Sequence, residues 1–513
     1  MTTTLTVLAT IATLFAGWRA TRRTRFFLHI FQLETYKFDR YARWLSDHVR
    51  SAVVRLSHVV GAAFISSRRY RSTQEKKPLA FTARMTRLTV ATGLVAILPL
   101  GLGAFYGWHT GDPSGVFWYL LGFLVTDLGA PLWVAVGAGL THPIENIIQD
   151  GFKRQARTRL SNRPDLTIVG ITGSYGKTST KFILAELLRQ KYNVYATPSS
   201  YNTPMGLCLA VNEDVKPEHQ VLVLEYGIRY PGDIDELCDI ARPDVSVVTT
   251  VGVAHLETMG SQDAIAQEKG KLVKYTTSDG PAVLNADDQR VDAMAARTDG
   301  PVWRISSTGD SVADITAHDV RYDTDGTSFV VRDDTGTEAA FEISLLGKHN
   351  VTNVLLAVAV GRSMGLRLRQ MAHAANRLEP IEHRLQLRRR GDVTIIDDAF
   401  NSNPVGARNA VEILGQMNGA RRVIVTPGMV EMGERQWTEN KALGAHIAEH
   451  DIDLAVLVGD EQTEAIREGL TEAAYPEERI KVFSSLFEAQ DFLKQHLQSG
   501  DVVLYENDLP DQY

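Results

Sequence analysis

The sequence predicts an α/β fold preceded by a membrane region, and three observations support this prediction. Long apolar stretches lie within residues 1–140, an excess of positive charge is found in the same region, and a pattern of strand, glycine-rich turn and helix begins at Leu166. A chain of 513 residues has room for about three domains. The 44% hydrophobic and 22% charged residues exclude a disordered chain, and the two cysteines exclude a disulfide scaffold and a zinc site built from cysteine alone.

The charges divide the chain into two parts. Residues 1–160 contain 20 Lys and Arg against 8 Asp and Glu, whereas the remaining residues contain 34 and 53. The first part therefore has a net charge of +12 and the second a net charge of −19. This asymmetry favours an anionic membrane surface as the environment of the first part and water as that of the second.

Three stretches are long and apolar enough to cross the hydrocarbon core of a membrane, which takes about 20 residues. They are residues 2–18, 88–108 and 116–140. The first stretch is followed by four arginines within residues 19–25, and the loop 109–115 between the other two contains no Lys or Arg. By the positive-inside rule, the basic segment 19–87 and everything after Leu140 are expected in the cytoplasm, and the N-terminus outside.

Alternatives exist for these stretches. Residues 2–18 have the length of a signal peptide, but no positive segment precedes them and no clear cleavage site follows. Residues 88–108 alone would also fit a buried core helix, although the short polar loop to the third stretch favours a membrane hairpin. Asp127 is the one acid of the third stretch. It is either a functional residue within the membrane or a hydrogen-bonded residue at a break near Gly129 and Pro131.

The rest of the chain alternates short β-branched runs with helical spacing, which is typical of mostly parallel sheets. A strand at 166–170 is followed by a helix at 178–191, where apolar residues recur at helical spacing. Further strands are expected at 220–224, 245–250, 282–284, 393–396, 422–425, 454–458 and 502–504. Short alternating strands within 301–345 indicate an antiparallel section, and 377–387 is the expected linker between two α/β domains.

A glycine-rich loop joins the first strand to the first helix. Its sequence is Gly170-Ile-Thr-Gly173-Ser174-Tyr175-Gly176-Lys177-Thr178-Ser179. Glycines let backbone N–H groups approach phosphate oxygens, and the helix N-terminus favours negative charge. Lys177 would contact the outer phosphates, and Thr178 would offer its hydroxyl to Mg²⁺. Because Ile171 replaces the usual first glycine, the loop matches the shorter form G-x-x-G-K-T. Its strand and helix context favours nucleotide binding over a turn of no special purpose, with residues 173–179 as the binding segment.

Nine further segments follow the loop in an order that resembles the Mur ligases, which are ATP-dependent amide-bond-forming enzymes of cell-wall precursor synthesis. They are residues 201–206, 225–227, 254–257, 268–270, 284–288, 347–353, 383–386, 397–404 and 427–433. The resemblance covers about residues 165–513 and is closest to the D-alanyl-D-alanine-adding type. It implies ATP and Mg²⁺ as cofactors, and a reaction in which a carboxylate is activated as an acyl phosphate before an amine attacks.

The resemblance also implies a catalytic and metal-binding set. Mg²⁺ would be held by Thr178, Glu225 and His255, and by Lys269 once carbamylation has turned its cation into a carboxylate-like ligand. The expected catalytic residues are Lys177, His255, Lys269 and Arg384, the last of which would face phosphate. From the residues alone, Glu225 also fits a solvated acid at a strand end, and His255 a structural histidine. Lys269 also fits a solvated helix face together with Glu268 and Lys271.

The resemblance further implies that Asn285, Asn350 and Asp397 hold the nucleoside. Amides can recognise an adenine edge, and an acid can accept from ribose hydroxyls. Asn350 also fits the cap of an apolar helix that begins at Val351. In the last domain, Asn401, Asn403 and Glu431 would face the incoming amine or peptide. This sequence departs from the family at Phe400, where Tyr is usual, and in residues 1–160, where the predicted spans stand in place of the domain that binds the UDP end of the precursor.

We therefore expect a membrane region at 1–160, an ATP-binding Mur ligase central domain at 161–376, and a smaller Rossmann-like C-terminal domain at 377–513. The expected function is that of a membrane-anchored, ATP-dependent acid–amino-acid ligase of peptidoglycan precursor synthesis, located at the cell membrane with its ligase domains in the cytoplasm. Its partners would be a small-molecule or lipid-linked peptide precursor, an amine such as D-Ala-D-Ala, and the membrane, without nucleic acid. The alternatives are a polyglutamate-type synthase and a catalytically degenerate nucleotide-binding scaffold at the membrane.

Overall fold

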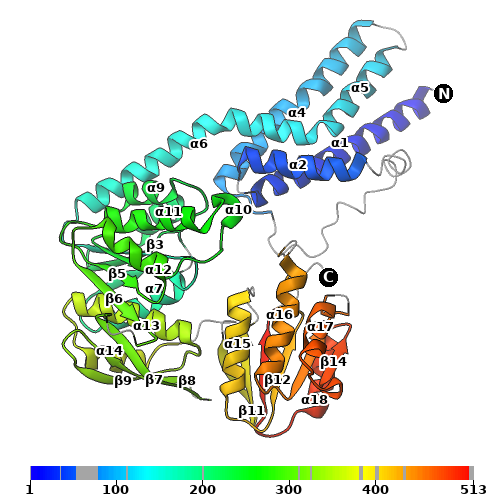
Figure 1. Cartoon of the computed structure of the whole chain (residues 1–513). Helices are drawn as coiled ribbons and strands as arrows, with labels where there is room; N and C mark the ends of the chain where they lie inside the picture. Colours follow the sequence, from blue (N-terminus) through cyan, green and yellow to red (C-terminus); the bar gives the residue numbers. More distant parts are fainter. Residues whose placement is uncertain are drawn as a thin grey trace. The chain divides into compact units, whose positions relative to one another are not determined.

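The computed structural model describes most of the chain (Figure 1). The described residues are 2–34, 36–53, 79–110, 114–198, 201–309, 312–323, 326–379, 385–398, 404–430, 432, 435–460 and 462–507. The chain divides into two compact units, residues 1–151 and 152–510. In their described parts the first unit is helical, and the second contains two β-sheets.

The first unit consists of helices. They are α1 (Thr2–Leu33), α2 (Phe38–Val53), α4 (Ala83–Thr110), α5 (Ser114–Leu128) and the first part of α6 (Ala130–Ser161). Among the described helices, α4 alone is long and apolar enough to cross a membrane, and α5 with α6 meets the same test only as a pair bent by 69°. The span predicted at 116–140 is thus divided between two helices that meet at a bend, and its crossing of a membrane stays a prediction. Pro131 has no N–H and is tolerated in the first turn of a helix, so a new helix begins at Ala130.

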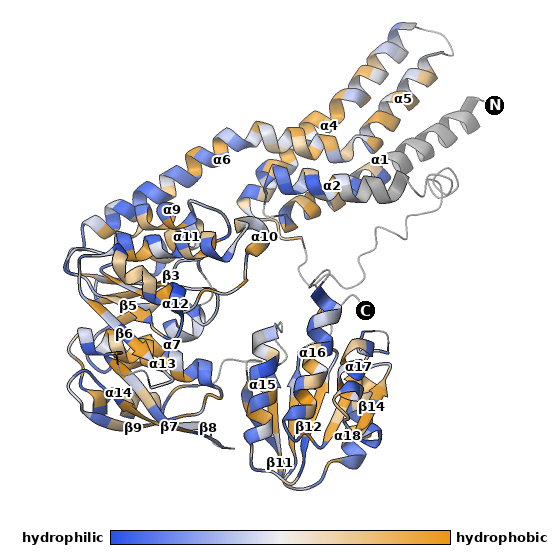
Figure 2. Cartoon of the chain, viewed as in Figure 1, coloured by the Kyte–Doolittle hydropathy of each residue, from blue (hydrophilic) through white to orange (hydrophobic). Residues whose placement is uncertain are grey.

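Glycines let α4 and α5 pack closely. A Cβ at Gly107 would lie 2.7 Å from the carbonyl oxygen of Gly115, and a Cβ at Gly103 would lie 2.5 Å from that of Trp118. Small residues at such contacts are typical of paired helices in membranes. Hydrophobic residues recur along both helices (Figure 2), and many of their large apolar side chains are exposed.

Asp127, at the end of α5, forms ion pairs with two arginines of α1. Its Oδ2 lies 3.2 Å from Arg19 Nη2 and 3.2 Å from Arg23 Nη1. The acid thus links α5 to α1 beside the bend at Gly129. This confirms the interpretation of Asp127 as a hydrogen-bonded residue at a helix break.

The second unit begins with a sheet whose described strands follow the order β2-β3-β1-β4-β5-β6-β7-β8-β9. The strands are β1 (Thr167–Thr172), β2 (Val194–Ala196), β3 (Val221–Glu225), β4 (Val245–Val248), β5 (Ala282–Asn285), β6 (Val302–Ser306), β7 (Ile315–Asp323), β8 (Gly326–Arg332) and β9 (Glu338–Ile343). Neighbours from β2 to β7 are parallel, and β8 is antiparallel to both β7 and β9. The predicted antiparallel section is thus confirmed for β7–β9, whereas β6 continues the parallel sheet.

Helices cover both faces of this sheet. They are α7 (Lys177–Leu188), α8 (Pro204–Leu209), α9 (Asp233–Ile240), α10 (Leu256–Met259), α11 (Gln262–Tyr275), α12 (Gln289–Asp292), α13 (Lys348–Ser363) and α14 (Leu368–Ala375). Alternate strand residues face opposite cores. Val221 and Val223 pack with the helices α7, α13 and α14, whereas Leu222 and Leu224 pack with α8, α9 and α11.

A second sheet has the order β10-β11-β15-β12-β13-β14 in the described residues. Its strands are β10 (Gln386–Arg390), β11 (Val393–Asp398), β12 (Arg422–Thr426), β13 (Leu454–Val458), β14 (Ile480–Phe483) and β15 (Val502–Glu506), and its helices are α15 (Pro404–Gln416), α16 (Gln436–Glu449), α17 (Glu464–Glu472) and α18 (Leu486–His496). All pairs are parallel except the edge pair β10 and β11. The predicted linker at 377–387 is therefore shorter than expected, because β10 begins at Gln386.

Candidate active site

The glycine-rich loop lies between β1 and α7, as the sequence predicts. Gly173 and Gly176 have φ angles of 152° and 80°, which side chains rarely adopt. A Cβ at Gly173 would lie 1.8 Å from Thr249 Oγ1, and a Cβ at Gly176 would lie 2.6 Å from Asn353 Oδ1. Only glycine fits both positions, so the loop keeps its backbone exposed to a ligand at the N-terminus of α7.

The loop is fixed to the residues that follow β4. The Ser174 N–H donates to Thr250 O at 2.8 Å, and the Ser174 hydroxyl accepts from the Gly252 N–H at 2.8 Å. The Thr249 hydroxyl donates to Tyr175 O at 2.5 Å. These bonds fix the orientation of the loop before a ligand binds, which is a form of pre-organisation.

Two predicted metal ligands meet at the carboxyl edge of the sheet. Thr178 begins the first turn of α7, and its hydroxyl donates to Glu225 Oε2, at the end of β3, at 3.0 Å. Glu225 is 1% exposed, so it is not a solvated acid at a strand end. The Glu225 Oε1 atom lies 2.9 Å from Lys181 Nζ but accepts no hydrogen bond of good geometry among the described residues.

Lys181 is a site residue that the sequence analysis missed. It lies one helical turn after Lys177, is fully buried, and donates to Thr197 Oγ1 at 3.1 Å. Burial lowers the pKa of Lys181, and the Glu225 carboxylate partly offsets this. A second lysine four positions after the loop lysine, on the buried face of an apolar helix, is the signal that could have found it.

His255 and Lys269 complete the charged cluster. His255 lies at the N-terminus of α10 with a φ of 68°. Burial lowers the pKa of His255, and the ammonium groups of Lys269 and Lys177 lower it further. The ring is therefore neutral at neutral pH, which is the form that binds a metal. The structure thus brings Lys177, His255 and Lys269 into one electrostatic environment.

Lys269 faces the interior, not the solvent. Its side chain, on α11, is 1% exposed. Burial lowers the pKa of Lys269 well below its usual range, and Lys177 lowers it further. Within the described part of the chain no hydrogen bond or ion pair involves its amine. Because the side chain is buried, the interpretation of Lys269 as part of a solvated helix face is wrong.

The neighbours of Lys269 explain its orientation. Glu268 Oε1 accepts from the N–H groups of Gly232 and Ile234, each at 3.0 Å, and so stabilises the N-terminus of α9. Lys271, which is partly exposed, lies 2.6 Å from Asp235 and 2.7 Å from Glu268. These contacts fix α11 against α9, and Lys269, which lies between the two residues in the sequence, is buried.

The predicted nucleoside residues Asn285 and Asn350 are both buried and bonded to the protein. The Asn285 side chain donates to Thr249 O at 3.0 Å and accepts from the Asp287 N–H at 3.1 Å. Asn350 donates to Leu346 O at 2.8 Å and accepts from Asn353 Nδ2 at 3.2 Å. The Asn285 amide thus fixes the end of β5, and the Asn350 amide fixes the first turn of α13. The contact of these two amides with a nucleoside stays a prediction.

The expected cap at Asn350 is wrong, because Gly347 occupies the N-cap of α13. The helix begins at Lys348, three residues before the predicted start, and Asn350 lies in its first turn. Asn353, one turn further, accepts from the Thr180 hydroxyl at 3.1 Å and lies against Gly176. This asparagine therefore connects α13 to the phosphate loop.

The remaining predicted residues belong to the second sheet or lie outside the described residues. Asp397 lies next to the last residue of β11, and its Oδ2 forms an ion pair with Arg388 Nη2 at 3.3 Å. Arg384, Phe400, Asn401, Asn403 and Glu431 lie outside the described residues, so their predicted roles stay predictions.

The residues at the sheet edge fit a nucleotide with Mg²⁺. The loop that contains Gly173 and Gly176 suits a phosphate group. The Thr178 hydroxyl and the Glu225 carboxylate offer oxygen atoms, which Mg²⁺ prefers. Glu225 Oε1 is a buried acceptor with no hydrogen-bond partner among the described residues. When bound, the metal would neutralise part of the phosphate charge, and Lys177 would neutralise another part.

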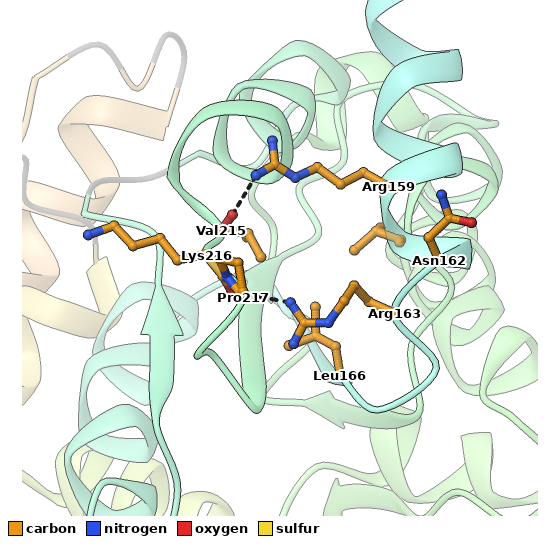
Figure 3. Close-up of a pocket in the computed structure, with 8 residues that line it drawn as sticks. Arg159, Asn162, Arg163, Leu166, Val215, Lys216 and Pro217 are labelled. Atoms are coloured by element: carbon orange, nitrogen blue, oxygen red, sulfur yellow. Dashed lines mark hydrogen bonds between the residues drawn. The ribbon is translucent and has the colours of Figure 1, made fainter.

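A separate pocket of about 250 Å³ lies between the end of α6 and the loop before β3 (Figure 3). Its two arginines are already engaged with the backbone: Arg159 donates to Val215 O at 2.8 Å, and Arg163 donates to His219 O at 2.7 Å. The pocket also lies at the amino end of β1, beside Leu166, whereas ligands of open α/β sheets bind at the carboxyl ends. It is therefore not part of the candidate site.

Comparison with known proteins places these two sheet domains in a family. Residues 171–361 match the Mur ligase middle domain, and residues 383–505 match the Mur ligase glutamate ligase domain. The UDP-N-acetylmuramoyl-tripeptide–D-alanyl-D-alanine ligase of Mycobacterium tuberculosis is 36% identical over 358 residues, which are 66% of this chain and 70% of that protein.

Solved structures agree with this assignment. MurF ligase from Thermotoga maritima, in complex with ADP, has a TM-score of 0.62 and 28% identity, and the match covers 71% of this chain and 81% of that one. Folylpolyglutamate synthase from Mycobacterium tuberculosis has a TM-score of 0.52 at 17% identity, covering 71% of this chain and 95% of that one, and shares the fold alone. The chain therefore belongs to the Mur ligase family of ATP-dependent, ADP-forming ligases, whose cofactors are ATP and Mg²⁺.

Proposed function

We propose that this protein is a membrane-anchored ligase that joins D-Ala-D-Ala, or a closely related amine, to the peptide of a peptidoglycan precursor. The set formed by Lys177, Thr178, Glu225, His255 and Lys269, in which Glu225 and Lys269 are buried, is the observation that supports an active ligase. A nucleotide-binding scaffold would have no need of two buried ionisable groups beside its phosphate loop. The amine is inferred from the activity that names the Mycobacterium tuberculosis relative.

In the proposed reaction, a carboxylate of the precursor attacks the terminal phosphorus of ATP, which gives an acyl phosphate and ADP. The amine then attacks the acyl carbon, and phosphate and a proton leave as the amide forms. In this chain Lys177 would hold the phosphoryl oxygens, and the glycine loop would fix the nucleotide. Neutral His255 and a carbamylated Lys269 would supply further ligands for the metal.

A substrate comparison tests this function. We expect detergent-purified protein to release ADP and form an amide with D-Ala-D-Ala but not with L-Glu, when each is supplied with UDP-linked or lipid-linked tripeptide precursor. Turnover with L-Glu alone would instead support a polyglutamate-type synthase. Absence of ADP release with either amine and either precursor, from protein that binds ATP, would support the scaffold. The comparison of the two precursors identifies the acceptor.

The membrane anchor is supported by the surface of α4 and α5. Exposed apolar residues cover both helices: Val90, Leu94, Ile97, Leu98, Leu102, Phe105, Tyr106 and Trp108 on α4, and Val116, Phe117, Trp118, Leu120, Leu124, Val125 and Leu128 on α5. Water-soluble proteins rarely expose such a continuous apolar surface. Only 17% of the apolar window of α4 is buried, which argues against the core helix of a soluble domain. A membrane hairpin formed by α4 and the bent pair of α5 and α6 would account for this exposure.

Reporter fusions test the topology of this anchor. A reporter fused after Asp150 is expected to lie in the cytoplasm, and one inserted at Thr110 is expected to lie outside. The reason is that basic residues precede and follow the hairpin, whereas the loop 109–115 within it contains no Lys or Arg. The measurement is a paired alkaline phosphatase and fluorescent-protein assay at both positions. External location of the Asp150 fusion would separate the ligase from ATP and contradict the anchor as proposed.

A further inference from the structure

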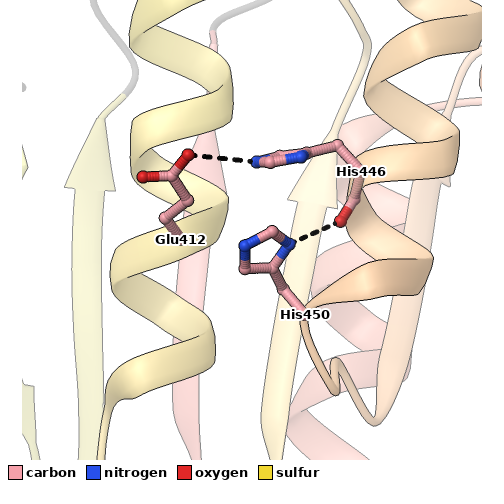
Figure 4. Close-up of side chains that lie close together, drawn as sticks. All are labelled: Glu412, His446 and His450. Atoms are coloured by element: carbon pink, nitrogen blue, oxygen red, sulfur yellow. Dashed lines mark hydrogen bonds and ion pairs between the residues drawn. The ribbon is translucent and has the colours of Figure 1, made fainter.

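A cluster of histidine and glutamate side chains lies between α15 and α16, within the domain of the second sheet. His446 and His450 are four residues apart, so they project from the same side of α16 and its C-terminal end. Glu412 projects toward them from α15 (Figure 4). One potential ligand atom of each of the three residues lies within 4.8 Å of the others. No residue of this cluster belongs to the candidate active site.

The hydrogen bond of His450 determines which of its ring nitrogens is available. His450 Nδ1 lies 2.9 Å from the carbonyl oxygen of His446. Because a carbonyl oxygen only accepts, Nδ1 carries the proton, and Nε2 of the neutral ring has a free lone pair. A histidine that donates through one nitrogen to a backbone carbonyl is the usual arrangement of a metal ligand.

His446 is oriented by two acids. Its Nδ1 lies 3.6 Å from Glu449 Oε2, and its Nε2 lies 3.5 Å from Glu412 Oε1. These are ion-pair distances, too long for hydrogen bonds. The Nε2 atom is buried and has no hydrogen-bond partner in the described part of the chain. A buried polar atom without a partner is unfavourable, and an ion bound between Glu412 and the two rings would satisfy it.

We propose that Glu412, His446 and His450 form a binding site for a divalent transition-metal ion of the Zn²⁺ type. Two imidazole nitrogens and one carboxylate oxygen are ligands that Zn²⁺ accepts, with water as the fourth. Glu449 would orient the ring of His446, and the His446 carbonyl would orient the ring of His450, each through the ring nitrogen that does not bind the metal. The sequence His446-Ile-Ala-Glu449-His450 also has the His-x-x-Glu-His spacing with which one group of zinc enzymes holds its metal on a helix.

The packing of the two helices favours this site. Gly415 of α15 approaches His450 so closely that a Cβ there would lie 2.7 Å from His450 O. The rings of His446 and His450 are 4.2 Å apart between centroids. The ligands therefore start near one another, and small side-chain rotations bring them to metal-ligand distances. An ion bound there would join α15 to α16 and stabilise the domain, because it binds the folded state alone.

Metal titration of the full chain tests the site. The detergent-purified protein is titrated with Zn²⁺ in excess Mg²⁺ and ADP, with a competing chelator to set the free concentration, and Co²⁺ absorbance reports the coordination. We expect one equivalent of Zn²⁺ to bind tightly to the wild-type protein and to the His255→Ala variant. We expect that equivalent to be lost in His446→Ala and in His450→Ala, and to bind at least about tenfold more weakly in Glu412→Gln.

His496→Ala is the matched control. His496, at the end of α18, also contacts a carbonyl one turn earlier, with its Nδ1 2.7 Å from Phe492 O, but it is exposed and outside the cluster. Zn²⁺ should raise the melting temperature of wild-type and His496→Ala protein but not of His446→Ala. If His446→Ala fails to fold, Zn²⁺ binding is compared in the His450→Gln and Glu412→Gln variants, because His450 and Glu412 are partly exposed. The proposal is overturned if wild-type protein binds no Zn²⁺, or if the equivalent is lost in His255→Ala and kept in the cluster variants.

Discussion

Replacing Lys177 with alanine is expected to abolish ATP turnover and to leave the fold intact. Lys177 Nζ donates to Gly173 O at 2.7 Å, so the ammonium lies over the phosphate loop at the N-terminus of α7. Charge on the transferring phosphoryl group spreads in the transition state, and a fixed ammonium stabilises it more there than in the ground state. Removal of one such group lowers turnover by about 10²–10³-fold. The measurement is ADP release under saturating substrates.

Loss of the same ammonium removes one hydrogen bond from the folded state, which costs about 1 kcal/mol. The melting temperature should therefore fall only slightly. Lys191→Ala is the matched control, because Lys191, just after α7, also donates to a carbonyl, Met364 O at 3.0 Å, but lies away from the loop. It should lose similar stability and keep its turnover. Wild-type turnover by folded Lys177→Ala protein would contradict the phosphate-loop assignment.

The sequence predicted the elements around the loop well because their signals are local. A β-branched run predicts β1, the glycines predict the loop, and apolar residues at helical spacing predict α7. All three signals lie within a short segment of the sequence. Glu225 could be placed near Thr178 because both follow parallel strands, whose carboxyl ends share one edge. The structure confirms that contact at 3.0 Å.

Other features depend on contacts between distant segments, and these were missed or wrong. Lys181 contradicts the apolar periodicity of its helix, and only its pairing with Glu225 explains a buried lysine there. The start of α13 was misplaced, because the glycine before it serves as the N-cap and has no capping side chain to recognise. The parallel direction of β6 follows from its pairing with β5, which its own alternating pattern does not reveal.

The break near Gly129 was one of the two interpretations that the sequence allowed for Asp127. Hydropathy averaged over residues 116–140 indicates one span, since apolar residues continue through it. The bend depends on Pro131 and on the ion pairs of Asp127 with Arg19 and Arg23, which lie more than 100 residues earlier in the chain. Periodicity and hydropathy detect elements, but the ends and bends of those elements here depend on single polar side chains.

Replacing Lys269 with alanine is expected to lower turnover by orders of magnitude while ATP binding weakens far less. The physical reason begins with burial: the amine is 1% exposed, and burial together with Lys177 keeps its pKa well below the usual range. A neutral amine is the form that reacts with CO₂, and the carbamate that results is an anion placed beside Lys177 and His255. Loss of that anion removes a metal ligand that neutral water cannot replace.

Measurements of ADP release and nucleotide affinity on Lys269→Ala separate this role from a structural one. Acetate or another small carboxylate in excess should enter the gap and restore part of the rate, and labelled bicarbonate should give a carbamate signal in wild-type protein that is absent from the variant. Lys274→Ala is the matched control, because Lys274 is exposed on the same helix, where substitutions usually change stability by under about 0.5 kcal/mol. Near-normal turnover by folded Lys269→Ala would exclude the carbamate.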